Sequence, residues 1–326
     1  MNMKKLIALV TVMVLTLTLF AGCGEAKPDG FQVAIVQQLE HSSLDEIAAG
    51  IKAQLEEMAQ EKGITLEIEI YNGQNDPTML SQICSRVVAD KVDIIIPIAT
   101  NAAIAAAAAA EESGTSVVYA AISDPEAADL TGIDYVTGVS DALNTPFILD
   151  MMFAVQPDIQ CVGLLYSNSE PNSAKPIAEA KAYLEARGIA YEEKTGVTPS
   201  EIIPAATALV GRVDAVFTPT DNVVMSAEAA VADILNEAGI PHYTGADSFV
   251  TAGAFATCGV NYTELGRKAG SMAMEILLGG AIPADYYVMD GGIITVNTET
   301  AAALAIDYAP FASMAGTVLE VTTAAE

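Results

Sequence analysis

The sequence predicts an α/β protein with two lobes, each built on a doubly wound parallel sheet. Short apolar runs alternate with segments of helical period along almost the whole chain after residue 30. Strands that alternate with helices of about 10–15 residues are typical of βαβ units, whose parallel strands are buried on both faces. The chain has 326 residues, which is more than one hydrophobic core usually serves. We therefore expect two domains.

The first half of the chain shows this alternation most clearly. The helix after the first strand carries apolar residues at 44, 47, 51, 55 and 58, and Gly63 ends it. The alanine-rich segment 101–112 has a very high helix propensity. We expect strands at 31–36, 64–71, 93–98 and 117–121, and helices at 44–58, 77–90 and 101–112.

The same pattern resumes in the second half. We expect strands at 161–166, 189–193, 213–218, 240–244, 253–258, 285–289 and 293–296, and helices at 174–187, 200–210, 222–238 and 262–278. One helix and two short strands cannot form a third core, so the segment after 260 must return to the earlier lobes. The expected lobes are 31–140 with about 262–289, and 141–261 with about 290–326. Residues 305–326 show neither period, and a loosely packed tail is expected there.

The N-terminus predicts an export signal followed by a lipid anchor. Lys4 and Lys5 precede an apolar run, and small residues lead to Cys23. The run is short for a permanent membrane span, which needs about 20 apolar residues. Residues 19–23 resemble a lipobox, so Cys23 would carry the lipid at the extracytoplasmic face of the cell membrane. The expected signal is 1–22 and the tether 23–30; ordinary secretion with an incidental Cys23 is the alternative.

The charge balance excludes several classes of partner. The formal net charge is −28, and loss of Lys4 and Lys5 with the signal takes it to −30. Nucleic acids and anionic lipids need clustered Lys and Arg, which this chain lacks. The charge suits a soluble surface protein and does not by itself indicate a cationic ligand.

No motif predicts catalysis, a metal or a cofactor. Cys84, Cys161 and Cys258 lie far apart in apolar segments, and the two histidines are isolated. The segment 138–142 lacks the second glycine of a nucleophile elbow, and phosphate-loop, dinucleotide and zinc-protease motifs are missing. We expect no cofactor, no metal and no enzyme activity, although an enzyme on this scaffold stays an alternative.

Polar residues cluster where the predicted strands end. Ligands of parallel sheets bind beyond the carboxyl ends of the strands, so these clusters would line a cleft between facing lobes. The simpler explanation is helix capping, which needs one such residue per helix. Several strand ends carry two or three, which favours a pocket for the set as a whole. The clusters are His41-Ser-Ser43, Thr100-Asn101, Ser123-Asp124, Ser167-Asn-Ser-Glu170 with Asn172-Ser173, Thr220-Asp-Asn222 and Asp247-Ser248.

Several longer motifs resemble the ABC-transporter substrate-binding family whose characterised members bind tryptophan or tyrosine. The resemblance covers roughly residues 31–305. Its motifs include Asn72-Gly-Gln-Asn-Asp76, Val92-Asp-Ile-Ile-Ile-Pro-Ile-Ala-Thr100, Val136-Thr-Gly-Val-Ser-Asp141, Val162-Gly-Leu-Leu-Tyr-Ser-Asn-Ser-Glu-Pro-Asn-Ser173 and Val213-Asp-Ala-Val-Phe-Thr-Pro-Thr-Asp-Asn222. The resemblance implies a type I periplasmic-binding fold, with a three-strand hinge and a small ligand enclosed when the lobes close.

The resemblance also implies an amino-acid ligand, which needs an acceptor for its ammonium group and donors for its carboxylate. We expect Asp221 to accept the ammonium group, with Asp247 as second choice. Carboxylate donors are expected at the helix N-termini, and polar contacts from the second lobe. The candidate ligand-binding residues are Thr100, Asn101, Ser123, Asp124, Asn168, Glu170, Asn172, Ser173, Thr220, Asp221, Asn222 and Asp247.

The implied function is the extracytoplasmic receptor of an ABC importer. Its first partner would be a small ligand, expected to be an amino acid, with the aromatic amino acids among the candidates. Its second partner would be an ABC permease in the membrane. We expect a monomer that binds no nucleic acid. The alternatives are a ligand-sensing receptor subunit, or a nucleoside or sugar in place of the amino acid.

Overall fold

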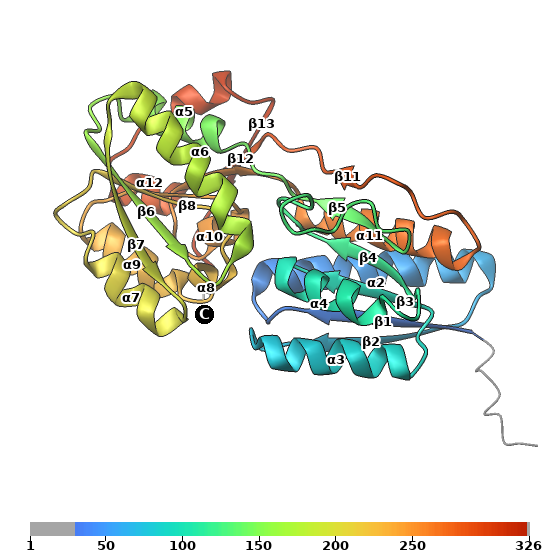
Figure 1. The fold of residues 1–326 in the computed structure, drawn as a ribbon. Helices are drawn as coiled ribbons and strands as arrows, with labels where there is room; N and C mark the ends of the chain where they lie inside the picture. The colour runs from blue at the N-terminus through green and yellow to red at the C-terminus, as the bar shows by residue number, and fades with distance from the viewer. Residues whose placement is uncertain (1–29, 325–326) are drawn as a thin grey trace, which may run out of the picture.

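The computed structural model describes residues 30–324, which form two α/β lobes joined by a hinge (Figure 1). Cys23, the expected signal at 1–22 and most of the tether lie outside the described residues. Within residues 30–324, no helix is both long enough and apolar enough to cross a bilayer. The predicted class, α/β with two mainly parallel sheets, is confirmed.

The first lobe is a six-stranded sheet in the order β11-β5-β4-β3-β1-β2, and all of its neighbouring strands are parallel. Its strands are β1 (Phe31–Gln37), β2 (Leu66–Asn72), β3 (Ile94–Ile98), β4 (Ser116–Ala120), β5 (Val136–Ser140) and β11 (Tyr287–Val288). Its helices are α2 (Ser42–Lys62), α3 (Pro77–Ala89), α4 (Thr100–Ala110) and α11 (Tyr262–Leu277).

Alternation along β1 explains why both faces of this sheet carry helices. Val33 and Ile35 pack in the core beneath α2 and α11, whereas Ala34 and Val36 pack beneath α3 and α4. A strand with apolar residues at every position must be covered on both sides, which is the doubly wound arrangement in Figure 1.

Helices α2 and α11 lie so close together that their contact requires glycine. A Cβ atom on Gly266 would lie 2.4 Å from the carbonyl oxygen of Ile47, and one on Gly270 would lie 2.8 Å from that of Ile51. The two backbones therefore pack against each other directly, although the helices are far apart in the sequence.

The second lobe is a seven-stranded sheet in the order β13-β12-β10-β9-β8-β6-β7. Its strands are β6 (Cys161–Ser167), β7 (Ala190–Gly196), β8 (Ala215–Thr218), β9 (His242–Thr244), β10 (Ala256–Gly259), β12 (Ile293–Asn297) and β13 (Thr317–Val321). Its helices are α5 (Thr145–Val155), α6 (Pro171–Arg187), α7 (Pro199–Thr207), α8 (Asn222–Met225), α9 (Glu228–Glu237), α10 (Asp247–Thr251) and α12 (Thr298–Ala303), with the 3₁₀ helix η2 (Ala309–Ser313). Strand β12 runs antiparallel to β10, and the other pairs are parallel.

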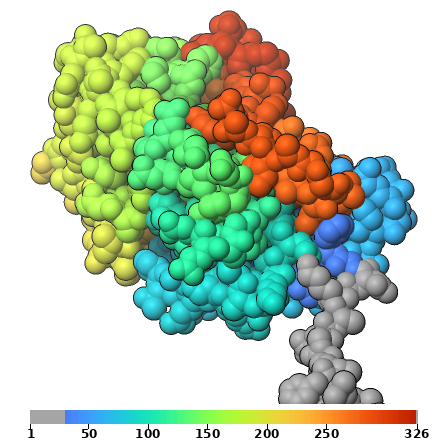
Figure 2. Space-filling model, turned by 45° about the vertical axis from the view of Figure 1, so that its right-hand side comes forward, coloured from blue at the N-terminus to red at the C-terminus, as the bar shows by residue number. Residues whose placement is uncertain are grey.

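The chain passes between the sheets three times. The crossings lie between Ser140 and Thr145, between Gly259 and Tyr262, and between Val288 and Ile293. Two helices begin directly after such crossings, so the hinge and the beginnings of α5 and α11 are continuous. The carboxyl ends of β3, β5 and β8 lie where the two lobes meet, and the space-filling view in Figure 2 shows the lobes packed against each other.

The expected loose tail at 305–326 is wrong over its described part. The 3₁₀ helix η2 buries Phe311 completely, and β13 pairs with β12 as the edge strand of the sheet. The segment shows no clear hydrophobic period because β13 is largely exposed. Phe311 is its single fully buried aromatic residue among those described. The helix expected at 222–238 is also interrupted between Met225 and Glu228, giving α8 and α9.

Replacement of Phe311 by alanine tests whether the C-terminal segment is part of the core. Its ring packs against Phe255, with ring centroids 6.1 Å apart, and no part of it is exposed. We expect Phe311→Ala to lower the free energy of unfolding by about 3–5 kcal/mol, measured by urea denaturation. Leu319→Ala in β13 is the control, because Leu319 is 45% exposed and its loss should change stability by about 0.5 kcal/mol or less. Equal effects of the two substitutions would contradict this packing.

Candidate ligand-binding site

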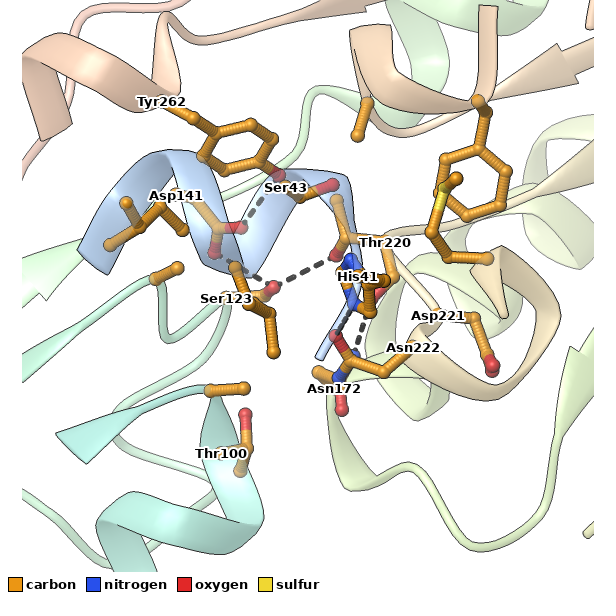
Figure 3. Close-up of a pocket in the computed structure, with 17 residues that line it drawn as sticks. His41, Ser43, Thr100, Ser123, Asp141, Asn172, Thr220, Asp221, Asn222 and Tyr262 are labelled. Carbon is orange, nitrogen blue, oxygen red and sulfur yellow. Dashed lines mark hydrogen bonds between the residues drawn. The ribbon is translucent and has the colours of Figure 1, made fainter. Parts of the chain in front are cut away.

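A cavity lies between the lobes, where the carboxyl ends of both sheets face each other (Figure 3). The space between its lining atoms is about 370 Å³, including the part that is open to solvent. The lining comes from α2, α4, α6, α8, α10 and α11, mainly near their N-terminal ends, and from the loops that follow β4 and β5. The lining residues are His41, Ser43, Leu44, Ile47, Ala99, Thr100, Ala121, Ser123, Asp141, Asn172, Thr220, Asp221, Asn222, Met225, Ala246, Phe249 and Tyr262.

The N-terminus of α4 forms one polar wall. The residue before the helix, Ala99, has φ 74° and no side chain that could cap the first N–H groups. Asn101 N–H is taken by Gln38 Oε1 at 3.2 Å. The hydroxyl oxygen of Thr100 is buried and has no hydrogen-bond partner among the described residues. This wall therefore offers a hydroxyl and the positive end of a helix to an acceptor in the cavity.

Asp141 supplies the buried carboxylate of the first lobe. Its Oδ1 accepts from Ser123 Oγ at 2.9 Å, and its Oδ2 accepts from Tyr262 O–H at 3.3 Å. Burial raises the pKa of Asp141, because no cation among the cavity-lining residues compensates the charge. A carboxylate held only by hydroxyl groups at a cavity is suited to a cationic group of a ligand.

Asp141 is absent from the residues that sequence reasoning selected. It directly follows β5, so the rule that ligands bind beyond parallel strand ends applies to it as well. In the sequence Asp141 ends a family-like motif at the first hinge crossing, where no strand is predicted, so it does not stand out as a residue after a strand end.

Asp221 also lines the cavity, but its carboxylate is occupied by the protein. Oδ1 accepts from the backbone N–H groups of Val223 and Val224, which begin α8. Oδ2 accepts from Ser167 N–H and Ser173 Oγ, each at 2.7 Å. Four donors use its acceptor positions, so Asp221 positions α8 and the end of β6. Asp141 takes its place as our proposed acceptor for an ammonium group.

Several hydrogen bonds cross the cleft and hold the lobes together. Ser123 Oγ lies 3.1 Å from Thr220 Oγ1, and the hydroxyls of Ser43 and Ser248 are in contact. His41 Nε2 lies 3.0 Å from Asn222 Oδ1, as Figure 3 shows. At the rim, Lys175 pairs with Asp124 at 3.2 Å. The lobes are therefore in a closed arrangement.

The structure brings half of the sequence-predicted residues to the cavity. Those lining it are Thr100, Ser123, Asn172, Thr220, Asp221 and Asn222. Asn172 donates to the carbonyl oxygen of Thr220 at 2.6 Å, and its own Oδ1 is buried without a partner among the described residues.

The other predicted residues lie behind the cavity or at its rim. Ser173 supports Asp221, and Glu170 bonds Gln38 and Asn222. Asn101 donates to the carbonyl oxygen of Ser169 across the cleft. Asn168 bonds Thr195, and Asp124 receives Ala127 N–H in addition to its ion pair with Lys175.

Asp247, the second choice for the ammonium acceptor, is not among the residues that line the cavity. Burial raises its pKa to about 6, with a further contribution from the nearby Glu46. It lies at the start of α10, in the interface between the lobes.

An apolar wall lies beside the polar groups of the cavity. It is formed by Leu44, Ile47, Met225, Phe249 and the ring of Tyr262, whose hydroxyl bonds Asp141. Tyr119, Tyr166 and Tyr243, which lie in strands of the two sheets, are not among the lining residues. Two of them are fully buried in the lobes, and the hydroxyl of Tyr166 bonds Glu193.

Comparisons with known proteins relate the chain to one protein family. The family model described as ABC transporter substrate binding protein matches residues 32–313. A tyrosine-binding protein of Clostridioides difficile (strain R20291) is 32% identical over 322 residues, covering 92% of each chain.

Two solved structures at 30% identity differ in how well they superpose. A Streptococcus pneumoniae ABC domain in complex with L-Trp gives a TM-score of 0.81 over 89% of this chain and 100% of that one. A ligand-free, open substrate-binding protein of Clostridium difficile gives 0.67 over 90% of this chain and 100% of that one. The lobes described above are thus arranged more like those of the complex than those of the open protein.

Substitution of Asp221 separates a structural from a ligand-binding role. In Asp221→Asn an NH₂ group replaces one acceptor oxygen and faces buried N–H or O–H donors. We expect the free energy of unfolding of the ligand-free protein to fall by about 1–3 kcal/mol. The control is Asp124→Asn, a surface cap and ion pair whose loss should cost about 1 kcal/mol or less. Unchanged stability together with complete loss of ligand binding would instead make Asp221 a direct ligand contact.

Proposed function

Because the chain belongs to the ABC transporter substrate-binding family, we propose that it captures a zwitterionic amino acid with an apolar, preferably aromatic, side chain for import. Its relation to this family is the one that the sequence motifs indicated, and its fold is the type I periplasmic-binding fold. Members of the family bind substrates for an ABC transporter and do not transform them, in agreement with the prediction that the chain is not an enzyme.

The observation that carries the proposal is the carboxylate of Asp141. It is 5% exposed and lies at the cavity, and its side-chain partners among residues 30–324 are two hydroxyl groups. A buried carboxylate without a cation is costly, and a ligand ammonium group would compensate it. A sugar or a neutral nucleoside offers no such cation, which disfavours both alternatives.

The opposite wall suits the second charge of a zwitterion. Helix α4 presents its N-terminus and the unpartnered Thr100 hydroxyl, and the N-terminal ends of helices favour anions. No Lys or Arg lines the cavity, so the carboxylate of the ligand would be held by N–H and O–H groups. An anion without an ammonium group would meet Asp141 and be repelled.

The apolar wall supports a large side chain on the ligand. Phe249 and Tyr262 are aromatic, and Met225 adapts easily to flat rings. The relative named for tyrosine and the structure bound to L-Trp favour the same side-chain class.

Binding should appear as thermal stabilisation. We expect L-tryptophan or L-tyrosine to raise the melting temperature with increasing concentration, because ligand binds only the folded state. Glucose, ribose and uridine serve as comparison ligands. A shift with one of these and with no amino acid would replace the proposed ligand class, and the ligand found would identify the correct one.

Loss of the Asp141 charge should remove most of this affinity. We expect Asp141→Asn to weaken binding by about 2–5 kcal/mol, at least about 30-fold in Kd, measured by calorimetry. Asp150→Asn on α5 is the matched control, because this carboxylate lies near the surface in an ion pair with Arg187. Equal affinity of Asp141→Asn and the control would contradict the role of Asp141.

We also propose that the mature protein is anchored by lipid on Cys23 at the outer face of the cell membrane, with an ABC permease as its partner. The support is in the sequence: two lysines, an apolar run and the 19–23 segment before a polar tether. Two or more acyl chains hold a protein stably at a bilayer.

Removal of the acceptor thiol tests the anchor. In cells that process lipoproteins, we expect the wild-type chain in the membrane fraction and Cys23→Ala in the soluble extracytoplasmic fraction or retained with its signal. Cys161→Ala controls for loss of a thiol elsewhere. Equal membrane association of mature wild-type and Cys23→Ala chains would contradict lipidation.

A further inference from the structure

Glu170 joins the two lobes beside the cavity without lining it. Its Oε1 accepts from Gln38 Nε2 of the first lobe, and its Oε2 accepts from Asn222 Nδ2 of the second lobe, both at 2.6 Å. Glu170 is 3% exposed in this closed arrangement. Among residues 30–324, the side-chain partners of this carboxylate are therefore one amide from each lobe, and the backbone N–H of Asn222 contributes as well.

Asn222 connects Glu170 to His41, which lines the cavity. The amide uses its Nδ2 for Glu170, and its Oδ1 lies 3.0 Å from His41 Nε2. The other ring nitrogen, His41 Nδ1, is buried and has no partner among the described residues. Burial lowers the pKa of His41, so the ring is neutral and carries one N–H.

We propose that the protonation state of Glu170 sets, through the Asn222 amide, whether His41 Nδ1 offers the ligand a hydrogen-bond donor or an acceptor. When Glu170 is ionised, it needs the Asn222 NH₂ group, so the amide oxygen faces His41. The His41 proton then lies on Nε2, and Nδ1 is an acceptor.

Protonation of Glu170 reverses each of these bonds. The carboxylic acid donates to the Asn222 oxygen, and the amide turns its NH₂ group toward His41 Nε2. The ring then carries its proton on Nδ1, which becomes a donor. The proton on Glu170 comes from solvent, and His41 exchanges one N–H for the other, so the ring stays neutral in both states.

The surroundings explain why Glu170 takes a proton before its neighbours do. Burial raises the pKa of Glu170 to about 8, and the negative charge of Asp221 on α8 adds to this. Burial raises the pKa of Asp221 as well, but the four N–H and O–H donors that face Asp221 oppose this effect. The remaining ionisable neighbours are His41 itself and Asp45, which raises the pKa of His41. The nearest lysine on α6, Lys175, is paired with Asp124.

This inference rests on the proposed function only where it concerns the ligand. A donor at Nδ1 favours a ligand oxygen, and an acceptor favours an ammonium, an indole N–H or a phenol O–H group. Glu170 is thus a positioning residue that acts on specificity through two other side chains.

The test reads the His41 tautomer directly by ¹⁵N NMR of the imidazole rings. The chain has only two histidines, so the spectrum contains the ring signals of His41 and of the buried His242, which bonds Glu228 and Thr218. The lobes are locked without ligand by a disulfide in Ser43→Cys/Ser248→Cys, since these two hydroxyls are in contact across the cleft. Thiol titration before and after reduction verifies the lock.

We expect the protonated nitrogen of His41 to move from Nε2 to Nδ1 as the pH falls through about 8. Glu170→Gln in the locked protein should show the Nδ1–H form at every pH, because its amide donates to the Asn222 oxygen as the protonated acid does. Asn222→Ala, which breaks the connection but leaves Glu170 in place, should make the His41 tautomer independent of pH.

A His41 tautomer that is constant with pH in the locked wild type and the same in Glu170→Gln would overturn the proposal. So would an unchanged pH response in Asn222→Ala. Because the locked protein needs no ligand, these outcomes are independent of the melting screen. If the melting screen contradicts the amino-acid assignment, the tautomer result still stands. If the tautomer measurement contradicts the role of Glu170, the amino-acid assignment still stands.

Discussion

Carboxylates buried where two parallel sheets face each other are the constraint on which the rest of this site depends. Asp221 is stabilised by four donors of its own lobe, and Glu170 by one amide from each lobe. Asp141 accepts hydrogen bonds from two hydroxyl groups and lines the cavity. The three differ in what surrounds them: donors of one lobe, amides from both lobes, and a cavity. Under the proposed function, folding, closure and binding would therefore depend on separate acidic side chains.

The fold supplies this arrangement because parallel strands end at one edge. Each helix that follows such a strand begins at the cleft, so its free N–H groups and capping residues face the other lobe. Closure then brings polar residues of the two edges into contact, as Ser123 and Thr220 show. A cleft made this way needs little beyond the polar residues that follow parallel strands, plus one buried carboxylate.

Much of the fold was predictable from the sequence, whereas the roles of the site residues were not. The hydropathy of a continuous apolar run predicts strand β3, and the high helix propensity of alanine predicts α4. The polar clusters after the strands place Thr100 and Ser123 at the cavity. Asp221 and Asp141 were harder, because a cap and a ligand contact use the same residue type. Only hydrogen-bond geometry distinguishes them. Strand β13 was not predicted because it is an exposed edge strand without an apolar face. Its segment is anchored by Phe311 alone, which gives no recognisable sequence period.

The glycine seam between α2 and α11 has a consequence for how the protein folds. Ile47 and Gly266 meet although more than two hundred positions separate them, and β11 completes the same lobe. The first lobe therefore stays incomplete during synthesis until nearly the entire second lobe has been made. Such non-local contacts slow folding. Completion of the first lobe is thus a late event, which can follow only after most of the second lobe has left the ribosome.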